Sequence, residues 1–373
     1  DQNELVIELE KGNAEFYIRT GHMIFAPLPK AAFNPDGTFN KAFNDKPIGN
    51  GPFQMAEPWK REVSVKLTKF KDYNGAEKGF LQGINFKIFK EIPTGYLEFQ
   101  AGKLDTTPLT PELFAAAAKK YGQGFLEIPT AVLTYVVANT KVAPTDNVKF
   151  RQAISSAIDR PLITRTILDN RRVPATSIVP PQTVGHRQNV CEFCKHDPTR
   201  AKQLLSEAGG PKDIMLAFNA GAGHEEWTAA IAAQLKTTLG INVTLVPKTP
   251  FPEYLKFLDT PAWTGGLGRL GWAQDYPTPD NWLFPLLHSK SGDNHSKYNN
   301  PDFDARITSA QGELDAKKRL KLQQEAEDIA LNDMPLMPLW YGKSARVYAR
   351  AKFKTFPLDL QSGNPYWELV SLK

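Results

Sequence analysis

The spacing of hydrophobic residues along the chain predicts strands that alternate with helices. Apolar and polar residues alternate at 1–10, 63–67 and 84–88, and a run rich in β-branched residues fills 133–140. Each of these segments predicts a short strand. Residues 148–158 instead repeat apolar side chains at helical spacing, which predicts an amphipathic helix. The fold class indicated is therefore α/β.

The middle of the chain carries the clearest unit of this kind. Residues 214–220 read as a strand, 225–240 as a helix and 241–248 as a second strand. This order favours parallel strands joined by a crossover helix. Further on, one long helix is expected from about 301 to 332. With β-rich segments on both sides of this α/β centre, the pattern suggests one lobe inserted into another.

Composition narrows the class of protein. The chain has 373 residues, of which 41% are hydrophobic and 23% charged, with a net charge of +5. No apolar run approaches the roughly 20 residues of a membrane-spanning helix. Basic residues are interleaved with acidic ones, as in DAKKRLKLQQEAED at 315–328. This pattern indicates a solvated surface of mixed charge and gives no continuous basic patch that would bind nucleic acid. The first twenty residues carry neither the basic nor the apolar region of a signal peptide.

A literal G-x-G-x-x-G occurs at Gly266, Gly268 and Gly271. A dinucleotide fingerprint needs a preceding buried strand and a following helix. Here the preceding residues make a poor strand, and Pro277 and Pro279 exclude a helix directly after the motif. We therefore expect a rigid loop, held by proline, that presents an arginine, an aspartate and aromatic side chains.

The chain has only two cysteines, Cys191 and Cys194. A local disulfide that pins a surface loop is the favoured interpretation. Two alternatives stay open, a metal site completed by His186 and His196, and a pair of free thiols. The surrounding prolines argue against a thioredoxin-like redox motif. No resident metal or other cofactor is expected.

Seven segments together resemble the oligopeptide- and dipeptide-binding proteins of bacterial ABC importers, solute-binding protein family 5. In chain order they are GNGPFQM at 49–55 followed by Trp59, FQAGKLD at 99–105, VKFRQAISSAIDR at 148–160, HDPTRAKQLLSEAG at 196–209, GWAQDYPTPDNWL at 271–283, YNNPDFD at 298–304 and MPLMPLWY at 334–341. Each segment alone is weak. Their number and order make the resemblance specific.

The resemblance implies a bilobal periplasmic-binding-protein-like fold of type II, oligopeptide-binding class. Residues 133–342 would form the C-terminal lobe, and residues 1–132 with 343–373 would form part of the N-terminal lobe. In the family, the segment like NELVIELEKGNAEF lies well inside the chain, so the N-terminal lobe is expected to be incomplete here. The segment VKFRQAISSAIDR would pack its lobe and not touch ligand.

The function implied is the extracytoplasmic solute-binding component of an ABC transporter. Such a protein binds oligopeptides or dipeptides between two lobes, closes, and delivers them to a membrane permease. The resemblance implies a monomer without nucleic-acid partners, and the chain lacks catalytic motifs of an enzyme. Its expected place is the periplasm or the surface of a Gram-positive cell, such as an actinobacterium, where a lipid anchor outside this chain would hold it. The alternatives are a peptide-sensing protein, or a binder of a metal complex or sugar.

The resemblance also indicates site residues. Asp275 matches an aspartate that pairs with the ligand's α-amine, Arg269 an arginine that meets its carboxylate, and His224 a position near the ligand. The plain alternatives are a turn aspartate, a salt-bridge arginine and a histidine at the start of a helix. Aromatic side chains are expected to line the pocket, namely Trp272, Tyr276, Trp340 and Tyr341.

Overall fold

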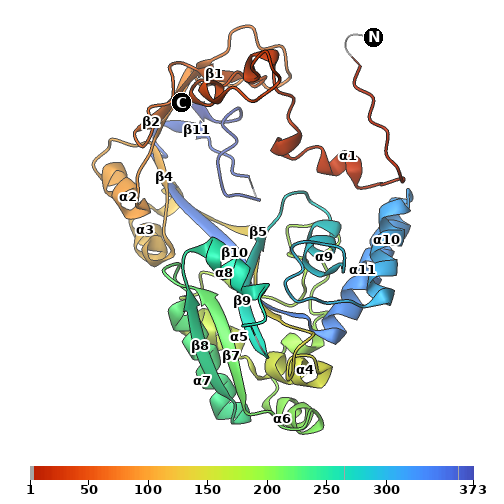
Figure 1. The fold of residues 1–373 in the computed structure, drawn as a ribbon. Coiled ribbons are helices and arrows are strands. Elements are labelled where there is room, and N and C mark those ends of the chain that lie inside the picture. Colours follow the sequence, from red (N-terminus) through yellow and green to blue (C-terminus); the bar gives the residue numbers. More distant parts are fainter. Residues whose placement is uncertain (1–3, 264, 360) are drawn as a thin grey trace. The chain divides into compact units, whose positions relative to one another are not determined.

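The computed structural model describes residues 4–263, 265–359 and 361–373, and the chain forms two compact units. Unit 1 contains the chain up to Met23 together with Ala131–Gly342. Unit 2 contains Ile24–Thr130 and Lys343–Lys373. The chain therefore crosses from one unit to the other three times (Figure 1).

Unit 1 is built on a mixed sheet. In spatial order its strands are β10 (Leu336–Tyr348), β5 (Phe125–Ala138), β9 (Gly266–Ala273), β7 (Asp213–Asn219) and β8 (Asn242–Lys248), with the short β6 (Val173–Pro174) paired to β10. Strand β7 is parallel to both β8 and β9, whereas β9 is antiparallel to β5. The parallel β7 and β8 with α7 (Glu225–Leu239) confirm the predicted β-α-β unit. Strands β5 and β10 continue into unit 2.

Most helices of unit 1 begin where the sequence provides a capping side chain. The side-chain oxygens of Asn147, Asp159, Asp197, Asn300 and Asp315 accept backbone N–H groups in the first turns of α4 (Val148–Ala157), α5 (Arg160–Thr166), α6 (Pro198–Glu207), α10 (Pro301–Gly312) and α11 (Ala316–Asp333). Such caps satisfy orphan donors at a helix start. Unit 1 also contains α8 (Phe251–Leu258), α9 (Asp280–Leu287) and the short α1 described below. A single large core contains the buried rings of Trp263, Trp282 and Trp340.

Unit 2 has smaller cores. Strands β1 (Phe53–Met55), β2 (Ser64–Lys69) and β3 (Gly83–Lys87) form an antiparallel sheet, β4 (Thr106–Pro108) pairs with the end of β10, and β11 (Phe353–Thr355) pairs with β12 (Ser371–Leu372). Helices α2 (Ile92–Gln100) and α3 (Phe114–Tyr121) complete the unit. One core contains Tyr96, Phe99 and Phe114, and a second gathers around Val370.

The first residues pack on unit 1, and this differs from the expected lobe boundaries. The short α1 (Phe16–Arg19) lies between Ala14, whose N–H donates to the Gln311 carbonyl at 2.7 Å, and a pair of Arg19 with Asp280. Glu15 is fully buried, where it accepts from Gln323 at 2.9 Å and pairs with Arg319. These polar contacts tie the segment to α9, α10 and α11.

Two of the elements predicted in unit 1 were wrong in the segments 4–9 and 301–332. Residues 4–9 lie in no helix or strand, and Leu5 is 84% exposed, because no strand in the described ranges pairs with this segment. The single helix expected from about 301 to 332 is two helices, α10 and α11, which lie side by side (Figure 1). Asp315 caps the second helix, and this cap interrupts the helical run.

Among the described residues, the structure has no helix that is both long and apolar enough to cross a membrane.

Candidate ligand-binding site

The glycine motif forms part of strand β9 and not a loop, contrary to expectation. A Cβ on Gly266 would lie 2.6 Å from the Met215 side chain and 2.7 Å from the Trp263 ring. A Cβ on Gly268 would lie 2.9 Å from Leu258. The glycines therefore let neighbouring side chains pack against the strand, a role that glycine takes where groups approach closely. A phosphate cradle is excluded, because a helix does not follow the motif directly.

Arg269 lies in the middle of β9, opposite Val136 of β5. Its Nη1 donates to Asn219 Oδ1 at 3.1 Å, and its Nη2 would lie 3.3 Å from a Cβ placed on Gly271. Gly271 thus leaves room for the guanidinium beside the strand. The Nε–H is buried without a hydrogen-bond partner among the described residues. Burial lowers the pKa of Arg269 to about 10, and the charge of Arg172 adds to the lowering.

His224 precedes the first turn of α7, at the carboxyl end of β7. The Trp227 indole N–H donates to its Nδ1 at 3.3 Å, so the ring proton of the neutral imidazole lies on Nε2. Burial lowers the pKa of His224 to about 4. The positive charges of Arg269 and Arg172 also lower this pKa, whereas the Glu225 carboxylate raises it. At neutral pH the side chain is therefore an uncharged donor.

This lowered pKa predicts a loss of stability in mild acid. The ordinary pKa of histidine is near 6.5. Between this pH and pH 4, the His224 side chain is therefore protonated in the unfolded chain but stays unprotonated in the folded one. The free energy of unfolding must therefore fall as the pH falls through this range. We expect urea denaturation of the native chain to show a larger loss from pH 7 to pH 4.5 than that of His224→Asn. Equal losses in the two proteins would contradict the buried neutral imidazole.

Asp275 follows β9, and its carboxylate is about half exposed. Its backbone N–H donates to Asn281 Oδ1 at 2.9 Å, and the Asn281 amide donates to its Oδ2 at 3.3 Å. The Nε2 atom of His22 lies 3.7 Å from its Oδ1. Neither partner was predicted from the sequence. Asn281 lies two residues after Pro279 in the same motif, and an asparagine so close to a proline turn is a recognisable candidate to bond the turn's backbone. No local sequence signal indicates His22.

The two aromatic residues beside Asp275 are engaged by other side chains. The Trp272 indole N–H donates to Asn281 Oδ1 at 3.3 Å. Tyr276 donates to Asp280 Oδ2 at 2.7 Å, and the Arg19 guanidinium lies 5.4 Å from the centre of its ring. Burial and the Asp280 carboxylate raise the pKa of Tyr276. Both rings thus help to fix the turn that carries Asp275.

Trp340 and Tyr341 are buried in the core of unit 1. Trp340 packs edge-on against Trp227 with ring centres 5.0 Å apart. Tyr341 donates to the Ser177 carbonyl at 2.9 Å and accepts from the Thr176 N–H at 3.3 Å. Their burial gives them structural contacts within the unit, and we do not include them in the site proposed below.

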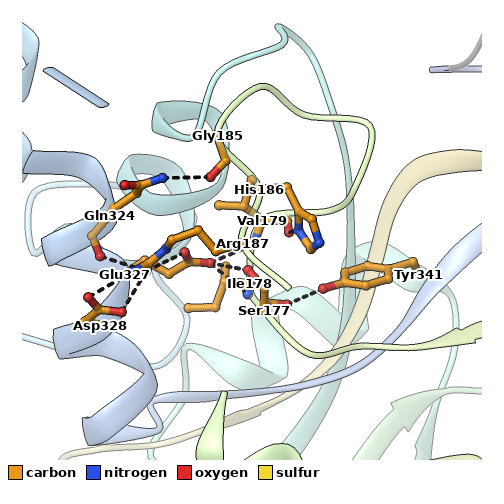
Figure 2. Close-up of polar contacts among 10 residues, drawn as sticks. All are labelled: Ser177, Ile178, Val179, Gly185, His186, Arg187, Gln324, Glu327, Asp328 and Tyr341. Carbon is orange, nitrogen blue, oxygen red and sulfur yellow. Dashed lines mark hydrogen bonds and ion pairs between the residues drawn. The ribbon is translucent and has the colours of Figure 1, made fainter. Parts of the chain in front are cut away.

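Figure 2 shows how the segment that follows β6 is fastened to α11. Glu327 is almost fully buried, and one of its oxygens accepts from the Ser177 hydroxyl at 2.5 Å and from the N–H groups of Ile178 and Val179 at 3.1 Å. Its other oxygen pairs with Arg187 at 2.9 Å. A single carboxylate therefore holds both ends of the segment 177–187.

Cys191 and Cys194 are joined by a disulfide in the structure, with their Cα atoms 5.3 Å apart. The two histidines considered as zinc ligands have other partners, His186 the Val179 carbonyl at 2.7 Å and His196 the Asp159 carboxylate at 3.4 Å. No group of three or more potential metal ligands converges within the described parts of the chain.

The family of the chain follows from comparison with known proteins. The model of the bacterial extracellular solute-binding proteins, family 5 (middle), matches residues 1–294, more than three quarters of the chain. The chain belongs to family 5. This family consists of solute-binding proteins, which agrees with the absence of catalytic motifs noted above.

Curated relatives in family 5 support the assignment. The oligopeptide-binding protein OppA of Bacillus subtilis is 28% identical over 351 residues, which cover 90% of this chain and 64% of that protein. The periplasmic murein peptide-binding protein MppA of Escherichia coli is 28% identical over 370 residues, covering 96% and 67%. The heme-binding protein A of Haemophilus influenzae is 28% identical over 353 residues, covering 91% and 63%. The chain thus spans about two thirds of the length of these relatives.

Solved structures confirm the α/β fold expected of family 5. The unliganded open form of the MppA murein tripeptide-binding protein aligns with a TM-score of 0.81 at 25% identity, over 98% of this chain and 71% of that one. HbpA2 from Haemophilus parasuis aligns with a TM-score of 0.82 at 25% identity, over 99% and 75%. The fold of this chain is therefore that of periplasmic binding proteins.

Proposed function

We propose that this chain belongs to an extracytoplasmic solute-binding component of an ABC transporter, and that unit 1 binds peptides by both of their charged ends. The observation that carries the proposal is the order of charges along β9 and the turn that follows it. The Arg269 guanidinium lies on the strand and makes no ion pair with a carboxylate in the described ranges, and the half-exposed Asp275 carboxylate follows six residues later. This order is complementary to a zwitterionic peptide.

Each end has suitable chemistry. Asp275 is oriented by Asn281 before a ligand arrives, which lowers the cost of ordering the carboxylate on binding. A carboxylate that meets an ammonium makes a charge-assisted hydrogen bond. At the other end Arg269 offers a planar pair of donors, and His224 adds a neutral one.

The spacing indicates the length of the peptide. The Arg269 guanidinium lies at the level of Gly271, and Gln274 still donates to the Ala131 carbonyl of the neighbouring strand. Four residues of extended chain between Gly271 and Asp275 span roughly 13 Å, about the length of a tetrapeptide. Tripeptides to pentapeptides are therefore the natural ligands to test.

Membership in the family and the names of the relatives support the wider role. OppA and MppA are named for peptide binding, and we extend that substrate class to this chain. A membrane permease as partner, a monomeric state, and a lipid anchor or a periplasmic place in the cell belong to the same proposal.

The test pairs a change in the protein with a change in the ligand. We expect Asp275→Asn to weaken calorimetric binding of tri-, tetra- or penta-alanine by about 10- to 100-fold, the effect of a hydrogen bond between charged groups. N-acetylation of the peptide should weaken binding by the native chain equally. Combining the two changes should cause little further loss, because both remove the same interaction.

Asp293→Asn, at an exposed aspartate in the same unit, is the matched control and should bind as the native chain does. Peptides bound with equal affinity by the native chain and by Asp275→Asn would show that Asp275 is only a turn residue. If the native chain binds none of these peptides, the proposed substrate class is wrong.

A further inference from the structure

Three basic side chains from separate elements gather around the carboxyl end of β7. Arg269 comes from β9 and contacts Asn219, the last residue of β7. His224 precedes α7, five residues further along the chain. Arg172 directly precedes β6, and the sequence motifs gave no indication of it. Ligands of α/β sheets characteristically bind beyond the carboxyl ends of parallel strands.

A continuous set of packed contacts places Arg172 near the other two. The β6 residues Val173 and Pro174 pair with Tyr341 and Trp340 of β10. Trp340 packs edge-on against Trp227, whose indole N–H donates to His224. Each link is a buried ring or a strand pairing, so the backbone that carries Arg172 has a fixed position relative to His224.

The two arginines of this cluster bind neutral acceptors in the described parts of the chain. Arg172 donates to the Arg171 carbonyl at 2.9 Å and Arg269 to a neutral asparagine, and neither makes an ion pair with a carboxylate in the described ranges. The nearby Glu225 accepts from the N–H groups of Gly221 and His224. Burial is the main cause of the lowered pKa of Arg269 and of His224, and the charge of Arg172 lowers both further.

One carboxylate would neutralise only one of the two guanidinium groups. We propose that the cluster of Arg172, His224 and Arg269 receives two negative charges, so that the preferred peptides end in aspartate or glutamate. The α-carboxylate meets Arg269 and His224, and the side-chain carboxylate meets Arg172. This inference rests on the proposed function and specifies the substrate class of the same site.

Matched tetrapeptides test the preference. Ala-Ala-Ala-Glu carries the second charge at its C-terminus, Ala-Ala-Ala-Gln replaces that charge by an amide of the same shape, and Glu-Ala-Ala-Ala has the same composition as the first but carries the charge at the other end. We expect the native chain to bind the first at least 10-fold more tightly than the other two. Isothermal calorimetry at low and moderate salt supplies the affinities.

The variant Arg172→Gln should reduce this ratio to about one, while the affinity for Ala-Ala-Ala-Gln changes by less than about 3-fold. The neighbouring Arg171→Gln is the control, because Arg171 pairs with Asp169 and donates to Leu168, and it should keep the full preference. A merely structural role of Arg172 would weaken binding of both peptides alike.

Two outcomes overturn the inference and leave the proposed function intact. One is equal affinity for the glutamate- and glutamine-terminated peptides. The other is equal affinity for the two peptides that carry glutamate at opposite ends, which would indicate general attraction to a basic surface. Failure of all three tetrapeptides to bind would contradict the proposed function itself.

Discussion

Replacement of Glu327 by alanine is expected to lower the free energy of unfolding of unit 1 by about 3–5 kcal/mol, the usual effect of breaking a buried charged pair. The substitution removes the acceptor for Ser177, Ile178 and Val179 and leaves Arg187 without its buried partner (Figure 2). Buried donors left without acceptors lose hydration without compensation. Urea denaturation followed by the fluorescence of the buried tryptophans measures the effect.

The adjacent Asp328 provides a matched control. It also pairs with Arg187, at 2.7 Å, but its side chain is 54% exposed. Exposed ion pairs contribute about 1 kcal/mol or less, so Asp328→Ala should change stability little. Glu327→Gln should lie between the two, because an amide oxygen can still accept from Ser177 while its NH₂ group opposes Arg187. If Glu327→Ala and Asp328→Ala lowered the free energy of unfolding by similar amounts, the stability could not be attributed to the buried carboxylate of Glu327.

Local signals in the sequence predicted many of the elements. The helix predicted at 148–158 is present as α4, and Asn147, directly before it, caps its first turn. The β7-α7-β8 unit follows from periodicity over three adjacent segments. In both cases the determining contacts lie close together in the sequence.

The errors arose where contacts between distant segments determine the local structure or the burial of a side chain. Three glycines and a nearby pair of prolines suggested a loop, but the fit of Met215 against Gly266 and of Val137 against Gly268 makes glycine suitable for a strand. The stretch 315–328 was expected to be a solvated surface. Its Glu327 is instead buried by segment 177–187, some 140–150 residues earlier in the chain. Helical spacing places Glu327 on the buried face of α11 with Ala330 and Leu331, but nothing within the helix indicates which groups its carboxylate binds.

The candidate site likewise contains residues that local motifs indicated and residues that only the fold brings close. The resemblance indicated Asp275, Arg269 and His224, and the structure shows the partners that fix them. His22 lies 253 positions from Asp275, and Arg172 lies 97 positions from Arg269, so neither belongs to a local motif. Trp340 and Tyr341 were expected at the ligand from the resemblance and from the aromatic lining that binding pockets commonly have. Both are buried in the core of unit 1, and their contact with a ligand stays a prediction.

Replacement of Arg160 by lysine is expected to cost about 3 kcal/mol of stability, although the charge is kept. Arg160 is buried, and its guanidinium donates to Pro338 at 2.6 Å, to Ser155 at 2.9 Å and to the Cys194 carbonyl at 3.0 Å. It thus joins the end of α4, the disulfide segment and β10. A lysine ammonium cannot reach three separate acceptor sites in the geometry of a guanidinium fork, and each unpaired buried acceptor costs about 1–3 kcal/mol.

Arg160 is the last residue of VKFRQAISSAIDR, and its guanidinium fixes three segments of unit 1 at once. Burial lowers the pKa of Arg160 to about 9, so the fold tolerates this cation only because carbonyl and hydroxyl oxygens surround it. Arg165→Lys, on the exposed side of the same helix, is the control and should change stability by less than about 0.5 kcal/mol. Equal urea midpoints for the two lysine variants would show that the charge, and not the fork of donors, is what the core requires at Arg160.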